Sequence, residues 1–252
     1  MIDLFNIKGK KAIVTGGSRG LTYSMAEALL EAGCEVSVIG RSDKIFEVSE
    51  NWNKKGYKSY AVRADLSIKE ENYRAFRECM DYLKDIDILV CGAGIISRHT
   101  AEEFPISEWE ETLNVNLSST FIMCQEAAKI MIKKGYGKII TVSSMCSYFG
   151  GQTVPAYSAS KGAVMQLTKA LANDWATYGI NVNSIAPGYM ATDMTEGIRT
   201  NPERFKNISD RIPMGRWGTG EDMKGATIFL SSKASDYLSG AIIPVDGGYL
   251  CK

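Results

Sequence analysis

Short apolar runs alternate with longer segments of helical period along almost the whole chain. Seven runs are predicted to be strands: Lys11–Thr15, Glu35–Ile39, Lys58–Arg63, Ile86–Cys91, Lys138–Val142, Ile180–Ile185 and Ala241–Val245. Six segments are predicted to be helices: Leu21–Glu31, Ile45–Lys55, Glu70–Leu83, Trp109–Lys133, Ser158–Tyr178 and Glu221–Ser231. Most of the strand runs are continuously apolar, which is typical of strands buried on both faces. The alternation therefore predicts an α/β fold, with a doubly wound parallel sheet of about seven strands and helices on both faces.

Charge and cysteine content narrow the classes of function. The 252 residues carry 29 Lys and Arg against 29 Asp and Glu, so no global field attracts nucleic acid or an anionic membrane. No segment has the long apolar run of a signal peptide or a membrane span, so we expect one cytoplasmic domain over residues 1–252. The six cysteines form no CxxC pair and are expected to be reduced. The one histidine, His99, gives a zinc site or a Ser–His triad little to use, and we expect no metal site.

Four motifs follow directly after predicted strands. They are Gly16–Gly20, Gly92–Gly94, Ser144 and Pro187-Gly188. The carboxyl ends of parallel strands meet at one edge of a sheet, where ligands bind, so we expect these motifs to line one site. A glycine turn before a helix also attracts a phosphate, although an ordinary βα loop is the alternative. The polar segment 189–217 is predicted to be a lid over this site, with a peripheral helical insertion as the alternative.

Tyr157 and Lys161 are four residues apart in a segment of helical composition, so they share one helix face. An ammonium about 4 Å from a phenolate, at an effective dielectric constant near 20, contributes about 4 kcal/mol. That attraction would lower the pKa of the phenol from about 10 towards about 7, opposed by desolvation of both groups. A tyrosine with such a pKa can transfer a proton near neutral pH. A surface lysine one turn from a half-buried tyrosine is the alternative for the isolated pair.

The full set of motifs resembles the short-chain dehydrogenase/reductase family over essentially the whole chain. The resemblance rests on TGGSRGL at Thr15–Leu21, ADL at Ala64–Leu66, GAG at Gly92–Gly94, NVNL at Asn114–Leu117, SS at Ser143-Ser144, YSASK at Tyr157–Lys161, APG at Ala186–Gly188 and VDGG at Val245–Gly248. It implies a single-domain Rossmann fold and an NAD(P)-dependent oxidoreductase that acts on CH–OH groups. It also implies a homotetramer, because the family is usually tetrameric.

The resemblance implies a catalytic tetrad. Tyr157 would be the general acid/base, and Lys161 would lower its pKa and hold the nicotinamide ribose. Ser144 would hydrogen-bond the substrate oxygen, and Asn116 would hold a relay water beside Lys161. Ser143 is expected to be structural, with a second role as the better-placed hydroxyl as the alternative.

The resemblance also implies a cofactor site along the strand ends. Its residues would be Gly16, Ser18, Arg19, Gly20, Leu21, Arg41, Asp65, Leu66, Ala93, Gly94, Tyr157, Lys161, Pro187, Gly188, Met190 and Thr192. Gly40 stands where an acid would bind a ribose 2′-hydroxyl, and Arg41 follows it. With Arg19 this favours NADP(H), since arginine pairs well with phosphate, and NAD(H) is the alternative. Two segments at this edge depart from the family pattern: Thr22 replaces the usual third glycine, and Cys91-Gly92 replaces the usual Asn-Asn.

Several segments resemble one branch of the family, the gluconate 5-dehydrogenases and the 2-deoxy-D-gluconate or 2-keto-3-deoxygluconate dehydrogenases. They are LFNIKGK at residues 4–10, GIISRH at 94–99, EFPISEW at 103–109, VPAYSASKGAVM at 154–165, APGYMATDMT at 186–195 and RIPMGRWG at 211–218. The branch implies interconversion of a secondary hydroxyl and a ketone on a sugar acid. A hydroxy or keto acid needs a cation for its carboxylate, so the substrate residues would be Arg98 and Arg216, with Ser144, Gln152 and His99 beside them. A surface arginine, or one that pins the lid, is the alternative for each.

Two other functions fit the same motifs. One is a 3-oxoacyl-thioester (acyl-carrier-protein) reductase, which a basic patch near the site would favour and the neutral charge balance does not. The other is a non-catalytic dinucleotide-binding sensor, for which Thr22 and Cys91-Gly92 are the argument and the intact tetrad the counter-argument.

Overall fold

The computed structural model describes residues 3–252, so residues 1 and 2 of the expected domain lie outside it. A seven-stranded sheet in the order β3-β2-β1-β4-β5-β6-β7 forms its centre, and every neighbouring pair is parallel. The strands are β1 Lys11–Thr15, β2 Glu35–Gly40, β3 Lys58–Arg63, β4 Ile88–Cys91, β5 Gly137–Val142, β6 Ile180–Pro187 and β7 Ile242–Val245. This confirms the predicted doubly wound parallel sheet.

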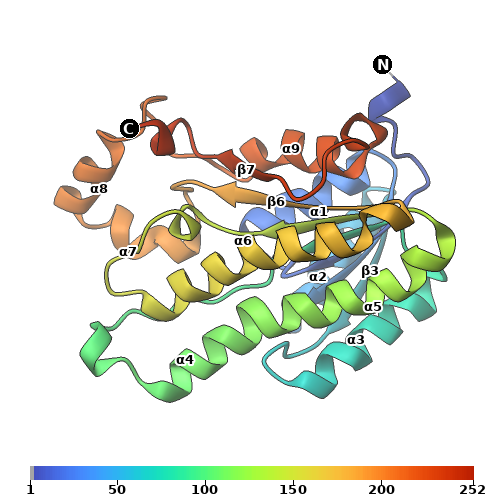
Figure 1. Cartoon of the computed structure of the whole chain (residues 1–252), viewed down its shortest axis with the longest axis horizontal. Helices are drawn as coiled ribbons and strands as arrows, with labels where there is room; N and C mark the ends of the chain where they lie inside the picture. The colour runs from blue at the N-terminus through green and yellow to red at the C-terminus, as the bar shows by residue number, and fades with distance from the viewer. Residues whose placement is uncertain (1–2) are drawn as a thin grey trace.

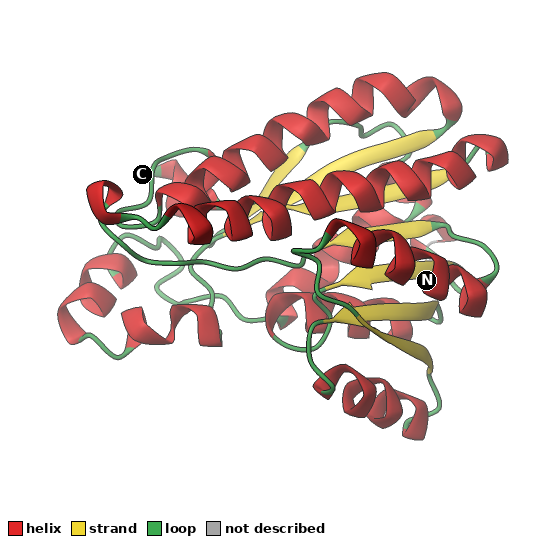
Figure 2. Ribbon diagram, turned by 90° about the horizontal axis from the view of Figure 1, so that it is seen from below, coloured by secondary structure: helices red, strands yellow, loops and turns green. Residues whose placement is uncertain are grey.

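Helices cover both faces of the sheet (Figures 1 and 2). Their bounds are α1 Gly20–Glu31, α2 Lys44–Lys54, α3 Lys69–Leu83, α4 Ile106–Leu113, α5 Ser119–Lys134, α6 Pro155–Trp175, α7 Glu196–Arg199, α8 Pro202–Ser209 and α9 Glu221–Ser231. The buried side chains of α3, α5 and α6 belong to one apolar cluster with the sheet, and those of α1, α2 and α9 belong to another. Among residues 3–252, no helix combines the length and the apolarity that crossing a bilayer requires.

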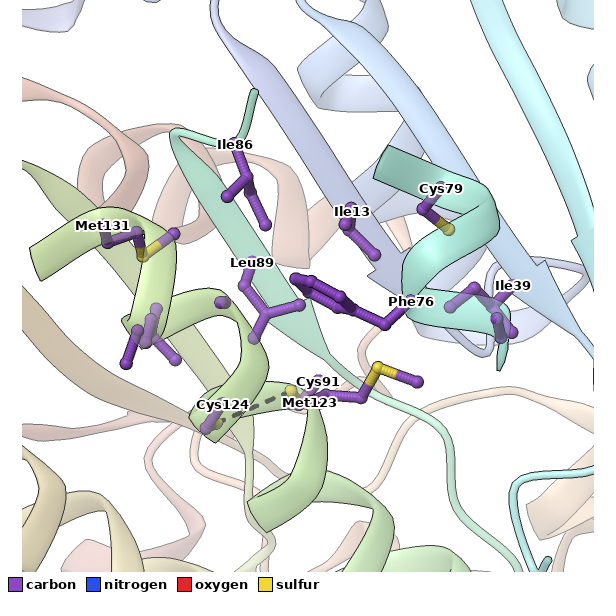
Figure 3. Close-up of a cluster of buried hydrophobic side chains, with 14 of the residues drawn as sticks. Ile13, Ile39, Phe76, Cys79, Ile86, Leu89, Cys91, Met123, Cys124 and Met131 are labelled. Atoms are coloured by element: carbon purple, nitrogen blue, oxygen red, sulfur yellow. Dashed lines mark hydrogen bonds between the residues drawn. The ribbon is translucent and has the colours of Figure 1, made fainter. Parts of the chain in front are cut away.

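The first of these clusters explains most of the buried cysteines (Figure 3). Phe76 of α3 lies beside Leu89 of β4 there, and Cys79 of α3 belongs to the same cluster. Cys91 at the end of β4 lies 3.8 Å from Cys124 of α5, measured between the sulfur atoms. These thiols fill a close-packed core.

The strand order reverses between β1 and β4, because the chain winds outward to β3 before it crosses to β4. The carboxyl ends of these two strands therefore separate the two halves of the sheet, which is where ligands bind in folds of this kind. Gly16 follows β1 and Gly92 follows β4, so both predicted loops lie at this point.

The predicted long helix at Trp109–Lys133 is wrong in detail. The chain forms α4, then a π-helical turn at Asn114–Ser118, then α5. Two hydroxyl groups at the start of α5 donate hydrogen bonds to backbone carbonyls of the turn: Ser119 Oγ to the Val115 carbonyl (2.6 Å), and Thr120 Oγ1 to that of Asn116 (2.9 Å). Such bonds compete with regular helical pairing, and single π-helical turns often mark functional sites.

The segment predicted to be a lid contains the short helices α7 and α8, which project beyond the carboxyl ends of the strands (Figure 1). An apolar cluster of its own anchors the segment: Ile198, Ile212 and Trp217 pack with Met145 and Tyr249. Phe205 stacks on Trp217 with ring centroids 5.5 Å apart. The segment is therefore attached to the loop after β5 and to the C-terminal turn.

Candidate active site

Helix α6 carries both Tyr157 and Lys161. Pro155 is its first residue, a position where the missing N–H of proline costs nothing. The Lys161 side chain is buried, and its Nζ donates a 2.6 Å hydrogen bond to the carbonyl of Val142, the last residue of β5. The same Nζ lies 5.7 Å from the centroid of the Tyr157 ring. The ammonium is thus close to the phenol ring but bonded to the sheet.

Ser144 lies two residues past β5 and begins a 3₁₀ turn. Its Oγ accepts a hydrogen bond from the Cys146 backbone N–H (3.1 Å), and Ser147 Oγ accepts one from the Ser144 N–H (3.3 Å). Ser147 Oγ also donates to the Lys161 carbonyl (2.7 Å), which ties this turn to α6. A hydrogen bond from the Ser144 side chain also lowers the Tyr157 pKa against the larger effect of burial, so the two side chains are brought together.

The neighbouring Ser143 points the other way. It is buried, donates to the Ile185 carbonyl (3.2 Å) and accepts from Ser184 (2.9 Å). This arrangement ties β5 to β6 and agrees with the structural role expected for Ser143.

The π-helical turn presents the Asn116 side chain to the loop after β4. Asn116 Oδ1 accepts from the Ile95 N–H (2.8 Å), and Nδ2 donates to the Ile95 carbonyl (3.0 Å) and to Ser160 Oγ (3.0 Å). Ser160 in turn donates to the Tyr157 carbonyl (2.7 Å). The amide therefore joins the π-helical turn, the loop after β4 and α6. All three of its hydrogen bonds are to protein groups.

Burial decides the pKa values of the pair. It raises the pKa of Tyr157 to about 12, against smaller lowering effects of the Ser144 hydrogen bond and the Arg98 charge. Burial also lowers the pKa of Lys161 to about 8, because the ammonium loses its hydration. The expectation that Lys161 lowers the Tyr157 pKa towards 7 is not met in this structure. Lys161 Nζ donates its hydrogen bond to the Val142 carbonyl, and desolvation of the phenolate is the largest influence on the Tyr157 pKa.

The glycine turn after β1 fits the phosphates of a dinucleotide. Gly16 has a φ of +78°, and a Cβ built on it would lie 2.8 Å from the Ala93 Cα, so only glycine allows this approach. Gly20 begins α1 with a φ of +65° and open space beside its Cα, which leaves the helix N-terminus accessible to an anion. Ser18 and Leu21 flank Arg19 and Gly20 in the same turn.

The Arg19 side chain extends from this turn towards the predicted lid, and its Nη1 is 3.5 Å from Asp193 Oδ2. Both side chains are exposed, so this contact contributes little to stability. Thr192, just before Asp193, caps a short 3₁₀ turn together with Thr195. Met190 is buried and pairs with Gly218 at the base of the segment.

A cavity of about 550 Å³ opens at the carboxyl ends of β2 and β3. Arg41 and Asp65, both predicted cofactor residues, line it. Arg41 Nη1 is 3.4 Å from Glu111 Oε1 on α4, with both side chains largely exposed. Asp65 accepts hydrogen bonds from Ser67, and these lower its pKa despite partial burial. Leu66 is buried in the core instead of facing the cavity.

The turn after β4 and the turn after β6 complete the edge. A Cβ built on Gly94 would lie 3.6 Å from Lys161 Nζ, so Gly94 adjoins the tetrad. The Gly188 N–H donates to the Val245 carbonyl (2.9 Å), which places Pro187 and Gly188 against β7.

The substrate candidates separate into free and paired side chains. Arg98 is exposed, forms no ion pair within residues 3–252, and its charge lowers the pKa values of Tyr157 and Cys146. Gln152 is exposed in the loop before α6. His99 Nε2 is 3.0 Å from Glu108 Oε2, so this ring is engaged at the start of α4.

Arg216 is engaged in a two-pronged ion pair with Asp222. Its Nη1 and Nη2 lie 2.9 and 2.6 Å from the two carboxylate oxygens, which holds the end of the predicted lid to the first turn of α9. The structure therefore gives Arg216 the lid-pinning contact that was the alternative to substrate binding.

Two side chains of this site escaped the sequence analysis. Cys146 is half-buried beside Ser144, where burial raises its pKa. Thr153 has a φ of +63°, which is strained for a β-branched residue, and its carbonyl accepts from the His99 N–H (3.0 Å). The S-x-x-S spacing of Ser144 and Ser147 was a usable signal, because it is a capping-box pattern. No pattern announces a positive φ at threonine.

Comparisons with known proteins extend these observations. A family model described as enoyl-(acyl carrier protein) reductase matches residues 16–250. The 2-dehydro-3-deoxy-D-gluconate 5-dehydrogenase of Bacillus subtilis is 44% identical over 250 residues, which cover 99% of this chain and 98% of that protein.

The chain belongs to the short-chain dehydrogenase/reductase family.

Membership makes it an NAD(P)-dependent oxidoreductase of CH–OH groups, which confirms the expected family and enzyme class. Two solved structures of the family are close in fold. A protein of Beutenbergia cavernae, provisionally named an NAD(P)-dependent gluconate 5-dehydrogenase and solved with NADP at low occupancy, is 40% identical with a TM-score of 0.96; the match covers 99% of this chain and 100% of that one. A gluconate 5-dehydrogenase of Burkholderia cenocepacia, solved with NADP and tartrate, is 35% identical with a TM-score of 0.95 and covers 99% and 98%.

Within residues 3–252, no three His, Cys, Asp or Glu side chains converge where an ion could be held.

The pH dependence of ketone reduction tests the assignment of the two pKa values. Below about pH 8 Lys161 is charged, and below about pH 12 Tyr157 is protonated. We expect kcat/KM for reduction to fall as the pH rises past about 8, when Lys161 loses its charge. A profile measured from pH 6 to pH 10 that stays flat would contradict the assignment to Lys161.

Proposed function

We propose that this enzyme interconverts a secondary hydroxyl and a ketone on a sugar acid, with NADP(H) as its preferred cofactor. The observation that carries the proposal is the position of Arg98. Arg98 is exposed in the loop after β4, forms no ion pair within residues 3–252, and its charge lowers the pKa values of Tyr157 and Cys146, so a substrate carboxylate would pair with it while the reacting oxygen faces Tyr157. The relatives named for gluconate-type substrates support the same choice, as does tartrate, a hydroxy acid, in one of the solved structures.

We propose that the tetrad divides the work as follows. NADP(H), when bound, supplies or accepts the hydride. Tyr157 is protonated at neutral pH because burial raises its pKa, so it gives a proton to the substrate oxygen during reduction and removes one during oxidation. Ser144 orients that oxygen. Lys161, whose ammonium lies 5.7 Å from the centre of the Tyr157 ring, would hold the nicotinamide ribose, and Asn116 fixes the loop that begins at Gly94.

The cofactor would lie along the strand ends. Gly16, Ser18, Gly20 and Leu21 would hold its phosphates, and Ala93, Gly94, Pro187 and Gly188 would flank the nicotinamide end. Arg41 and Arg19 would bind a 2′-phosphate, because both are exposed cations at this edge and Gly40 offers no competing acid. Met190 and Thr192 would border the same edge from the segment 189–217, which we propose acts as a lid.

An acyl-thioester reductase is the second candidate, because the matching family model is described by an acyl-carrier-protein activity. A non-catalytic sensor is the third.

We further propose that the enzyme is a cytoplasmic homotetramer. Exposed apolar side chains such as Ile106 on α4 and Phe121 on α5 favour self-association, and its six free cysteines suit a reducing compartment. Light scattering on the purified protein measures the assembly.

A substrate panel with Tyr157→Phe tests the function. The wild-type enzyme should consume NADPH with 5-ketogluconate faster than with an acetoacetyl thioester. Tyr157→Phe should lower kcat by roughly 10²- to 10⁴-fold, the usual contribution of a general acid, while NADPH affinity stays nearly unchanged. Faster turnover of the thioester would favour the second candidate. NADPH binding without turnover of any ketone would favour the sensor.

Arg41→Ala tests the cofactor preference. Loss of one charge-assisted contact to a 2′-phosphate should weaken NADPH roughly tenfold and leave NADH almost unchanged. Glu111→Gln, which removes the carboxylate that competes for Arg41, should tighten NADPH or leave it as it is. Arg77→Ala, an exposed arginine outside the cavity, is the control and should change neither affinity. Equal weakening of both cofactors by Arg41→Ala would remove the reason for preferring NADP(H).

Arg98→Ala tests the carboxylate contact. It should raise KM for a ketogluconate roughly tenfold, because the substrate loses its ion pair, and leave KM for an uncharged sugar ketone unchanged. Arg98→Lys should restore part of the loss. Arg216→Ala removes the other candidate cation. It should lower the thermal midpoint, because the ion pair with Asp222 is lost, and leave KM for the ketogluconate nearly unchanged. The carboxylate assignment fails if Arg98→Ala affects charged and uncharged ketones alike.

A further inference from the structure

The turn Gly92–Gly94 lies between the phosphate-binding turn and the catalytic residues. On one side, a Cβ on Gly16 would be 2.8 Å from the Ala93 Cα. On the other, a Cβ on Gly94 would be 3.3 Å from Asn116 Oδ1 and 3.6 Å from Lys161 Nζ. A shift of a few tenths of an ångström in this turn would therefore disturb both ends of the site.

Thr22 occupies the space beside this turn. It is the third residue of α1 and is buried. A Cβ built on Gly92 would lie 2.2 Å from Thr22 Cγ2, 3.0 Å from its Oγ1 and 3.2 Å from its Cβ. The Oγ1 also donates a long hydrogen bond to the Gly92 carbonyl (3.4 Å). The threonine side chain thus fills the volume that any side chain at position 92 would need.

The glycine at position 92 is required by this contact and not by its backbone conformation. Gly16 has a left-handed φ, whereas Gly92 does not, and the three atoms nearest to a Cβ at position 92 all belong to Thr22. A second threonine holds the opposite side: Thr15 Oγ1 accepts from the N–H groups of Gly92 and Ala93, each at 3.1 Å. The turn is fixed between one threonine of β1 and one of α1.

We propose that Thr22 is a positioning residue for the Gly92–Gly94 turn, and that Thr22 and Gly92 form an interdependent pair. The pair replaces the glycine and asparagine that are usual at these two positions in the family. What the turn positions, a nicotinamide cofactor against Lys161, rests on the proposed function. The steric dependence of position 92 on position 22 does not.

A double-mutant cycle tests the pair in the full-length enzyme. Gly92→Ala alone should lower the midpoint of thermal unfolding without cofactor by roughly 4–8 °C, because it overpacks the contact with Thr22. It should also weaken NADPH and lower kcat, each about tenfold, at a temperature where every variant is folded. In the Thr22→Gly background the same substitution should change the NADPH affinity and kcat by less than about twofold. It should also lower the unfolding midpoint by less than it does in the wild-type background.

Three variants serve as controls. Gly225→Ala places an alanine in α9 where no atom lies within 4 Å, and it should leave all three quantities unchanged or slightly raise the midpoint. Thr22→Ser removes only Cγ2, the atom in closest conflict, and should rescue Gly92→Ala in part. Thr22→Gly combined with Gly92→Asn places the usual family residues at positions 22 and 92 and should bind NADPH within about threefold of the wild type.

Joint recovery of kcat and affinity in the double variants separates positioning from a purely structural role, which would restore only the midpoint. Equal effects of Gly92→Ala in both backgrounds would overturn the inference. Failure of the wild type to bind NADP(H) or NAD(H) would instead refute the proposed function, and the unfolding midpoints would still measure the pairing of Thr22 with Gly92.

Discussion

The hydrogen bond from the Lys161 ammonium to the Val142 carbonyl holds the site together. A buried cation is costly unless it finds partners, and here the partner is the last carbonyl of a central strand. The bond fixes α6 against β5, and with it the height of Tyr157 above the sheet. Ser147, bonded to the Lys161 carbonyl, extends the same constraint to the Ser144 turn. The positions of Lys161, Tyr157 and Ser144 therefore depend on this one contact.

Most of the fold could be predicted from the sequence, because the same pattern of apolar strand followed by helix repeats along the chain. Continuous apolar runs such as Ile88–Cys91 are typical of buried parallel strands, and the residues after such strands must lie at one edge of the sheet. The spacing of Tyr157 and Lys161 was equally informative about their common face. Their pKa values were not predictable, because burial decides them and burial depends on elements far away in the sequence. The π-helical turn was invisible for a similar reason: NVNLS has no composition that distinguishes it from an α-helix.

The roles of the charged residues also depend on contacts between distant segments. Arg98 and Arg216 are equal candidates in the sequence, and the structure distinguishes them. Asp222 forms an ion pair with Arg216, whereas no carboxylate among residues 3–252 pairs with Arg98. A local signal existed for that pair: Thr219 and Asp222 have capping-box spacing, and the Thr219 N–H does donate to the aspartate (2.7 Å). Thr22 and Gly92 were noticed as separate departures from the family pattern. Their contact makes them one departure.

The π-helical turn at Asn114–Ser118 matters for the geometry of the proposed active site and not for the packing of the apolar core. Such a turn is an α-helix with one residue inserted, and the helices on either side keep their buried faces in register. Loss of a single codon there would close the helix into an ordinary one and leave the apolar core as it is. The asparagine amide would then lose its hold on Ile95 and Ser160.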